Sequence, residues 1–143
     1  SEEKLKAQIA SAAKTIELKK SKSKGNIQVN LLSLSRVGNK AYLRFSVLNY
    51  SDTPYRPLKV LVGVIQEKRN FLKKRQSGFV EFPAELLITN PIPQDSYQYG
   101  VLSFDYRPLG KGEKPVFRLM EDTEGSSLSQ ARTITIEGYR WLE

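Results

Sequence analysis

Apolar and polar side chains alternate along residues 40–49. A period of two residues sends alternate side chains to opposite faces of a strand, so Leu43, Phe45 and Val47 share one apolar face. A stretch with Ser, Asp and two Pro follows, and these residues favour a turn. Residues 58–65 are then apolar on both faces, which is typical of a central strand. The segment predicts two strands of a β-sandwich.

Seven segments of this kind are separated by turn-forming residues. They span residues 27–36, 40–49, 58–67, 78–87, 96–106, 116–121 and 132–142. Seven short strands with such turns predict a mainly β chain folded as an immunoglobulin-like antiparallel β-sandwich. An OB-type barrel is the alternative, but it needs only about five strands. The inward faces and the central strand predict one core that contains Leu43, Phe45, Val47, Val62, Val64, Phe104, Ile134 and Ile136.

Residues 2–20 carry apolar side chains at helical spacing, with no Gly or Pro. Leu5, Ile9 and Ile16 lie on one narrow stripe, which predicts an amphipathic α-helix. Such a helix is marginal alone in water, so we expect it to dock on the sandwich or on another chain. The polar residues 21–26 predict a linker. The expected organisation is a helix and linker over residues 1–26 and a sandwich over residues 27–143.

The amino-acid composition excludes several classes of catalytic and metal site. The chain has 143 residues with no His and no Cys, which removes the usual general base, the thiol nucleophile and the two commonest zinc ligands. We therefore expect no enzymatic activity, no cofactor and no metal. Glu121, Asp122 and Glu124 lack the spacing of a calcium loop, so an exposed acidic turn is the favoured interpretation. No apolar run approaches the roughly 20 residues of a membrane span.

Positive charge is concentrated in the first half of the chain. The net charge is +8 overall, with +4 in residues 1–26, +8 in residues 27–75 and −4 in residues 76–143. This asymmetry favours an acidic partner. The densest segment predicts a partner-binding patch that comprises Lys68, Arg69, Phe71, Lys73, Lys74 and Arg75. An anionic protein surface is the favoured partner, with nucleic acid stacked on the aromatic ring as a second possibility and a solvated hairpin tip as the purely structural alternative.

Aromatic residues mark the segment 96–106. Tyr97 and Tyr99 should share one face of the strand, opposite Phe104 and Tyr106. One pair is expected in the core, and the outward pair is a candidate platform for a peptide or sugar. Because aromatic residues are also common strand formers, an ordinary structural role is the favoured alternative. Near the C-terminus, the indole of Trp141 is a candidate to pack against the N-terminal helix.

Residues 40–76 also carry a family resemblance. An apolar strand ends at Asn49, Ser51 lies in a turn with Tyr55, and a second apolar strand leads into the basic sequence QEKRNFLKKRQ. The segment resembles the β-sandwich domain of the TraN family of conjugative-transposon transfer proteins. Residues 27–36 and the sequence RTITIEGYR near the end of the chain are similar to the preceding and closing strands of that domain. The resemblance implies a non-catalytic, envelope-located part of a DNA-transfer or secretion apparatus.

We therefore predict a structural or protein-interaction module of a bacterial cell-envelope assembly, either a conjugation or a secretion apparatus. The expected location is the periplasm or the cell envelope. Because the sequence starts with Ser, an upstream signal or anchor is left open. Two alternatives remain from other classes. One is a nucleic-acid-binding module that uses residues 68–75, and the other is a carbohydrate- or peptide-binding sandwich that uses Tyr97 and Tyr99.

Overall fold

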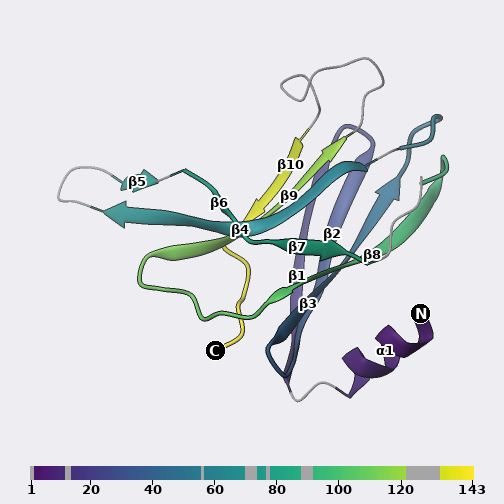
Figure 1. The fold of residues 1–143 in the computed structure, drawn as a ribbon. Coiled ribbons are helices and arrows are strands. Elements are labelled where there is room, and N and C mark those ends of the chain that lie inside the picture. Colours follow the sequence, from purple (N-terminus) through teal and green to yellow (C-terminus); the bar gives the residue numbers. More distant parts are fainter. Residues whose placement is uncertain are drawn as a thin grey trace.

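The computed structural model describes residues 2–11, 14–55, 57–69, 74–76, 78–87, 92–121 and 133–143. Within these residues the chain is mainly β, with two antiparallel sheets and one short N-terminal helix (Figure 1). The elements are α1 (Glu2–Ala10), β1 (Lys14–Lys24), β2 (Ile27–Val37), β3 (Lys40–Asn49), β4 (Pro57–Arg69), β5 (Lys74–Gln76), β6 (Val80–Glu81), β7 (Ala84–Leu86), β8 (Ser96–Asp105), β9 (Glu113–Glu121) and β10 (Thr133–Glu137).

The strand order is that of an immunoglobulin-like sandwich. One sheet has the order β1-β2-β3-β8-β7, and the other has the order β10-β9-β4-β5, with β6 also paired to β4. Without β1, the orders β2-β3-β8-β7 and β10-β9-β4 match strands A-B-E-D and G-F-C of an immunoglobulin domain, and β5 takes the place of strand C′. The predicted fold class is confirmed. Each of the seven predicted segments contributes one of the strands A to G.

The core lies between the two sheets. The rings of Phe45 on β3 and Phe117 on β9 meet across it, with their centroids 5.1 Å apart. Gly100 on β8 lies directly opposite Phe45, and a Cβ at that position would lie 2.4 Å from the ring. The glycine therefore leaves the space that the ring occupies. All eight side chains predicted for the core are buried in one cluster: Leu43, Phe45, Val47, Val62, Val64, Phe104, Ile134 and Ile136.

The predicted helix is wrong in its second half. α1 ends at Ala10, and residues 14–24 form β1, which pairs antiparallel with β2. The predicted linker is consequently the end of β1 and a turn, where Gly25 has a φ of 60°. Ile16 and Leu18 face the sandwich at strand spacing, and Leu18 is the buried side chain of β1. Pairing with β2 decides the conformation here, since strand formation depends on neighbours as much as on propensity.

Lysines attach the edge strand β1 to the other sheet. Lys22 Nζ donates a hydrogen bond to the carbonyl oxygen of Thr135 at 2.9 Å, and Lys24 Nζ donates to that of Thr133 at 3.4 Å. Both acceptors lie on β10. Lysine on an edge strand also discourages pairing with another chain. Lys22 and Lys24 thus help to hold the two sheets together, in addition to contributing to the net positive charge.

Two other predicted strands differ in their extent. The segment 78–87 forms two short strands, of which β6 pairs with β4 and β7 pairs with β8, so the chain changes sheets between them. The final segment forms a strand only from Thr133 to Glu137. At Gly138 the φ of 70° ends the strand, and its N–H donates to the carbonyl oxygen of Pro115 at 2.9 Å. β5 was not among the predicted strands.

Candidate functional site

The basic segment lies on a hairpin formed by β4 and β5, which extends to one side of the sandwich in Figure 1. The pairing of β4 with β9 ends at Gln66, and the last residues of β4 pair with β5. The register places Lys68 opposite Arg75, and Arg69 opposite Lys74. The tertiary structure therefore brings four of the predicted site residues together on two adjacent strands.

Residues 67–76, called the basic hairpin below, contain five cations and one acid. The acid, Glu67, forms an ion pair with Lys114 of β9 at the base of the hairpin. Like charges directly opposite each other in a ladder cost stability, so strand pairing within the hairpin does not itself favour the two facing pairs of cations. The register therefore concentrates formal positive charge on two adjacent strands. Phe71 and Lys73 lie outside the described residues.

The second predicted site, Tyr97 and Tyr99, lies on the outer face of the first sheet. The side chains are 59% and 49% exposed, and the ring centroids lie 5.3 Å apart with the rings nearly perpendicular. On the opposite face Phe104 is buried and Tyr106 is half-buried against the core, so the predicted separation of the two aromatic pairs is confirmed, with Tyr106 only partly in the core. An edge-to-face pair of tyrosines presents apolar rings and hydroxyl groups together.

A hydrogen-bonded polar row adjoins these tyrosines. Tyr99 lies opposite Ser46 on β3, whose Oγ accepts a hydrogen bond from Asn30 Nδ2 at 3.2 Å. Asn30 Oδ1 in turn accepts hydrogen bonds from Gln28 Nε2 at 2.9 Å and from Ser21 Oγ at 2.6 Å. This row has no signature in the sequence, because its members come from three strands. Aromatic rings beside amide and hydroxyl groups are common at protein interfaces and ligand sites.

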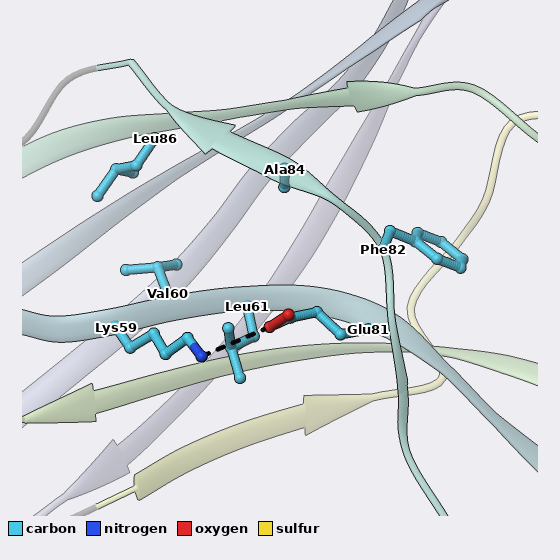
Figure 2. A pocket seen from close by; sticks show the side chains of 7 residues that line it. All are labelled: Lys59, Val60, Leu61, Glu81, Phe82, Ala84 and Leu86. Carbon is cyan, nitrogen blue, oxygen red and sulfur yellow. Dashed lines mark ion pairs between the residues drawn. The ribbon is translucent and has the colours of Figure 1, made fainter.

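A cleft of about 300 Å³ opens where the chain passes from β6 to β7 (Figure 2). Its walls are the aliphatic side chains of Val60, Leu61, Ala84 and Leu86, together with Lys59, Glu81 and Phe82. Lys59 Nζ and Glu81 Oε1 lie 3.8 Å apart across it. The Phe82 N–H donates to the carbonyl oxygen of Val62 at 2.8 Å, which anchors the crossing to β4. The cleft marks the change of sheet and presents one exposed ion pair among aliphatic groups.

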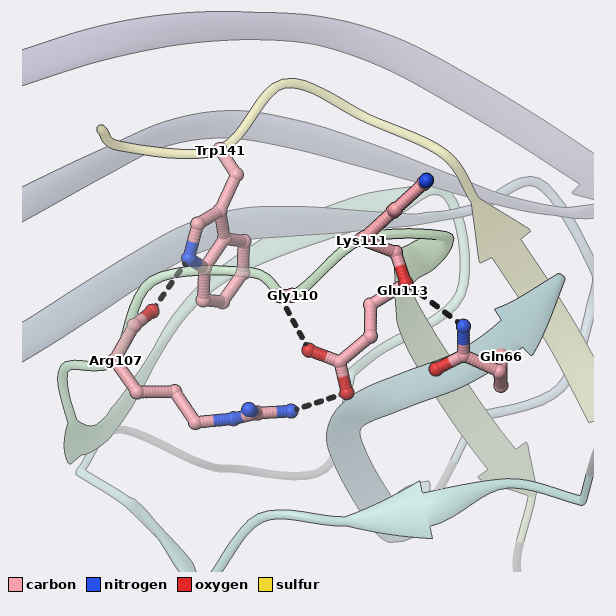
Figure 3. Close-up of polar contacts among 6 residues, drawn as sticks. All are labelled: Gln66, Arg107, Gly110, Lys111, Glu113 and Trp141. Atoms are coloured by element: carbon pink, nitrogen blue, oxygen red, sulfur yellow. Dashed lines mark hydrogen bonds and ion pairs between the residues drawn. The ribbon is translucent and has the colours of Figure 1, made fainter.

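Figure 3 shows a polar cluster that likewise has no signature in the sequence. Trp141 Nε1 donates to the carbonyl oxygen of Arg107 at 2.8 Å, and the Arg107 guanidinium pairs with Glu113 Oε2 at 2.9 Å. The N–H of Gly110 donates to the other carboxylate oxygen at 2.6 Å. The indole stacks on Phe104, with centroids 5.8 Å apart. Trp141 therefore packs at the end of the core, and the interpretation that it packs against the N-terminal helix is wrong.

This cluster keeps a carboxylate ionised. The hydrogen bond from Arg107, and then the one from the Gly110 N–H, lower the pKa of Glu113. A second bond, from Gln66 Nε2 to the carbonyl oxygen of Lys111 at 2.8 Å, ties the same turn to β4. Gly112 has a φ of 77°, in the region that favours glycine. The contacts fix the β8–β9 connection, so we assign the cluster to the fold.

Neither a metal-binding cluster nor a membrane-spanning helix is present among the described residues. Within the described ranges, no group of three or more His, Cys, Asp or Glu side chains is placed to hold a metal ion. Asp122 and Glu124 of the acidic turn lie outside those ranges. The part of the chain that the structure describes contains no helix of the length and hydrophobicity that a membrane span requires. No protein family, curated protein or solved structure matches this chain.

Proposed function

We propose that this chain is a non-catalytic protein-interaction module whose basic hairpin binds an acidic surface on a protein partner. The observation that carries the proposal is the register of β4 and β5, which sets Lys68 against Arg75 and Arg69 against Lys74 beyond the pairing with β9. This register places four cationic residues on one two-stranded ladder, which concentrates positive charge there. Residues that are already paired in a strand ladder also lose less conformational freedom on binding than residues of a disordered basic tail.

The proposed setting is a bacterial cell-envelope assembly, in the periplasm, with conjugative transfer or secretion as its process. The support for this setting is the resemblance of residues 40–76 to the TraN family. Within this setting the immunoglobulin-like sandwich acts as a rigid frame that holds the hairpin at one end. The partner is a protein with clustered Asp and Glu side chains.

A matched pair of triple variants tests the role of the hairpin. The first replaces Lys68, Lys73 and Lys74 by Gln. The control replaces Lys6, Lys20 and Lys111 by Gln, which removes the same charge from positions that are exposed and lie elsewhere. Binding of a fluorescent poly-glutamate peptide is measured by anisotropy at several salt concentrations. We expect the hairpin variant to lose about tenfold in affinity and the control to stay near the wild type, because three exposed ion pairs together contribute roughly 1–2 kcal/mol.

The same measurement with single-stranded DNA of equal total charge separates the alternatives. Tighter binding of DNA than of poly-glutamate, with a steep dependence on salt, would favour the nucleic-acid module instead. Equal losses in both triple variants would contradict a specific role for the hairpin. Aggregation of the hairpin variant alone would indicate that the cations protect the edge strand β5.

The exposed pair Tyr97 and Tyr99 favours a second candidate function, the binding of a peptide or carbohydrate on the outer face of the first sheet. Changing both residues to Ala removes the platform without touching the core. A glycan array and a peptide array, each probed with the wild type and the double variant, test it. Signals that persist in the double variant would place the binding elsewhere.

A further inference from the structure

A second surface feature lies between α1 and the first sheet. Figure 1 shows α1 beside this sheet, on the side away from β9 and β10. A cavity of about 600 Å³ separates the helix from the sheet. Ile9 and Ala10 line it from the helix, and Leu32 and Ser33 line it from β2. The cavity thus has an apolar wall on the helix side and a mixed floor.

Two irregularities in the sheet shape this floor. The β1–β2 register shifts between Glu17 and Lys20, and the β2–β3 register shifts between Leu31 and Ser33. Lys19 in the first bulge has a φ of 48°, a conformation uncommon for residues with a side chain. Such bulges re-aim side chains and are frequent next to functional sites, and local strain of this kind collects there as well. The bulges interrupt an otherwise regular ladder beneath α1.

The polar groups of the floor form one row across three strands. Glu17, Ser33 and Arg44 are successive partners in the β1–β2 and β2–β3 ladders. Ser33 is 7% exposed, and within the described structure its Oγ has no hydrogen-bond partner. Lys19 Nζ lies 3.4 Å from Glu17 Oε2, and both groups are largely exposed. Arg44 is exposed and makes no ion pair with the other described residues. Lys19, Arg44 and Glu17 together leave one net positive charge at the cavity.

We infer that this cavity binds a small aliphatic carboxylate. A buried hydroxyl without a partner costs free energy until a ligand accepts its hydrogen bond, and a guanidinium matches a carboxylate with two parallel N–H groups. Ser33 and Arg44 supply these donors side by side. Ile9, Ala10 and Leu32 supply the apolar surface that an aliphatic chain would cover. This site is separate from the basic hairpin and does not depend on the proposed partner.

The test uses the full chain, labelled with ¹⁵N, and three probes at constant ionic strength: hexanoate, hexanol and inorganic phosphate. We expect hexanoate to cause saturable shifts of the amide signals of Ile9, Leu32 and Ser33. Hexanol lacks the charge and phosphate lacks the aliphatic chain, so each should bind about tenfold more weakly or not at all. Equal binding of hexanoate and hexanol, or shifts confined to other residues, would overturn the proposal.

Variants locate the charged contact. Arg44→Gln should weaken hexanoate binding about tenfold and leave the weak hexanol binding unchanged, because only the charged probe uses the guanidinium. Lys111→Gln, which removes one positive charge from a distant exposed turn, should match the wild type. Ser33→Ala should also weaken hexanoate binding, and Arg44→Lys should fall between the wild type and Arg44→Gln. Equal effects of Arg44→Gln and Lys111→Gln would overturn the assignment.

Discussion

Two glycines inside strands illustrate how single residues permit the packing of this sandwich. A Cβ at Gly63 of β4 would lie 2.1 Å from the carbonyl oxygen of Val80, and one at Gly100 of β8 would lie 2.4 Å from the Phe45 ring. The first glycine lets β6 approach β4, and the second makes room for a core aromatic. Glycine generally weakens a strand, but at these two positions the missing side chain allows neighbouring atoms to pack closely against the backbone.

Tyr139 gives a prediction at the same scale. It is 3% exposed, and its hydroxyl group has no hydrogen-bond partner within the described residues. Burial raises the pKa of this phenol well above its ordinary value, because the charged form would lose its hydration. The unfolded chain releases this proton near pH 10 while the folded chain keeps it. The contribution of Tyr139 to stability is therefore complete below about pH 10 and declines as the pH rises further.

Replacing Tyr139 by Phe should remove that decline and the unpartnered hydroxyl. We expect the variant to equal or exceed the wild type by about 1 kcal/mol at neutral pH. It should also lose less stability than the wild type on going to alkaline pH. Urea unfolding at a series of pH values measures both effects. Parallel loss of stability in the two proteins above pH 10 would contradict the burial argument.

At the scale of elements, β1 and α1 differ in how much they contribute to the stability of the sandwich. β1 pairs along most of β2, buries Leu18 and reaches β10 through two lysines. α1 contributes Leu5 and Ile9, both only half-buried. Its stripe is too short to hold a helix alone in water. The sandwich should therefore depend on β1 and tolerate the loss of α1.

Two truncations test this difference. Removing residues 1–11 should lower the free energy of unfolding by less than about 1 kcal/mol, since none of the side chains described for residues 3–11 is fully buried. Removing residues 1–25 should cost about 3 kcal/mol or more, because it deletes a buried leucine and exposes the ladder of β2. Chemical denaturation measures both. Similar losses in the two truncations would mean that α1, rather than β1, carries the N-terminal contribution.

For the whole molecule, one core joins both sheets. The buried cluster includes Leu18 from β1, Phe104 from β8, Phe117 from β9 and Leu142 from the C-terminal segment. Trp141, the single tryptophan, packs against this cluster. A continuous core in a chain of this size is expected to unfold as one cooperative unit.

Trp141 fluorescence and far-ultraviolet circular dichroism should accordingly report one unfolding transition. The first signal follows the end of the core near the β8–β9 connection, and the second follows the sheets. We expect equal denaturant midpoints and equal slopes for the two signals. An earlier transition of the fluorescence would show that the C-terminal segment separates before the sheets unfold.

The positions of the seven central strand segments along the chain were predictable because they depend on local information. Alternation in residues 40–49 set which side chains face inward, and clusters of Gly, Pro, Asn and Asp marked the turns between strands. The outward position of Tyr97 and Tyr99 followed from the same period of two residues. The strands and their faces form as predicted because burial of the inward side chains in the core stabilises them.

The sequence alone therefore determined the class of fold, the inward faces and the concentration of charge in residues 68–75. Only the tertiary structure decided that residues 14–24 form a strand, since their lysines and serines lack a strong local pattern and become ordered by pairing with β2. It also decided the meeting of Trp141 with Arg107, which are 34 residues apart, and the row of Glu17, Ser33 and Arg44 under α1. Contacts of this kind depend on strand register and on bulges, and neither leaves a periodic trace along one chain.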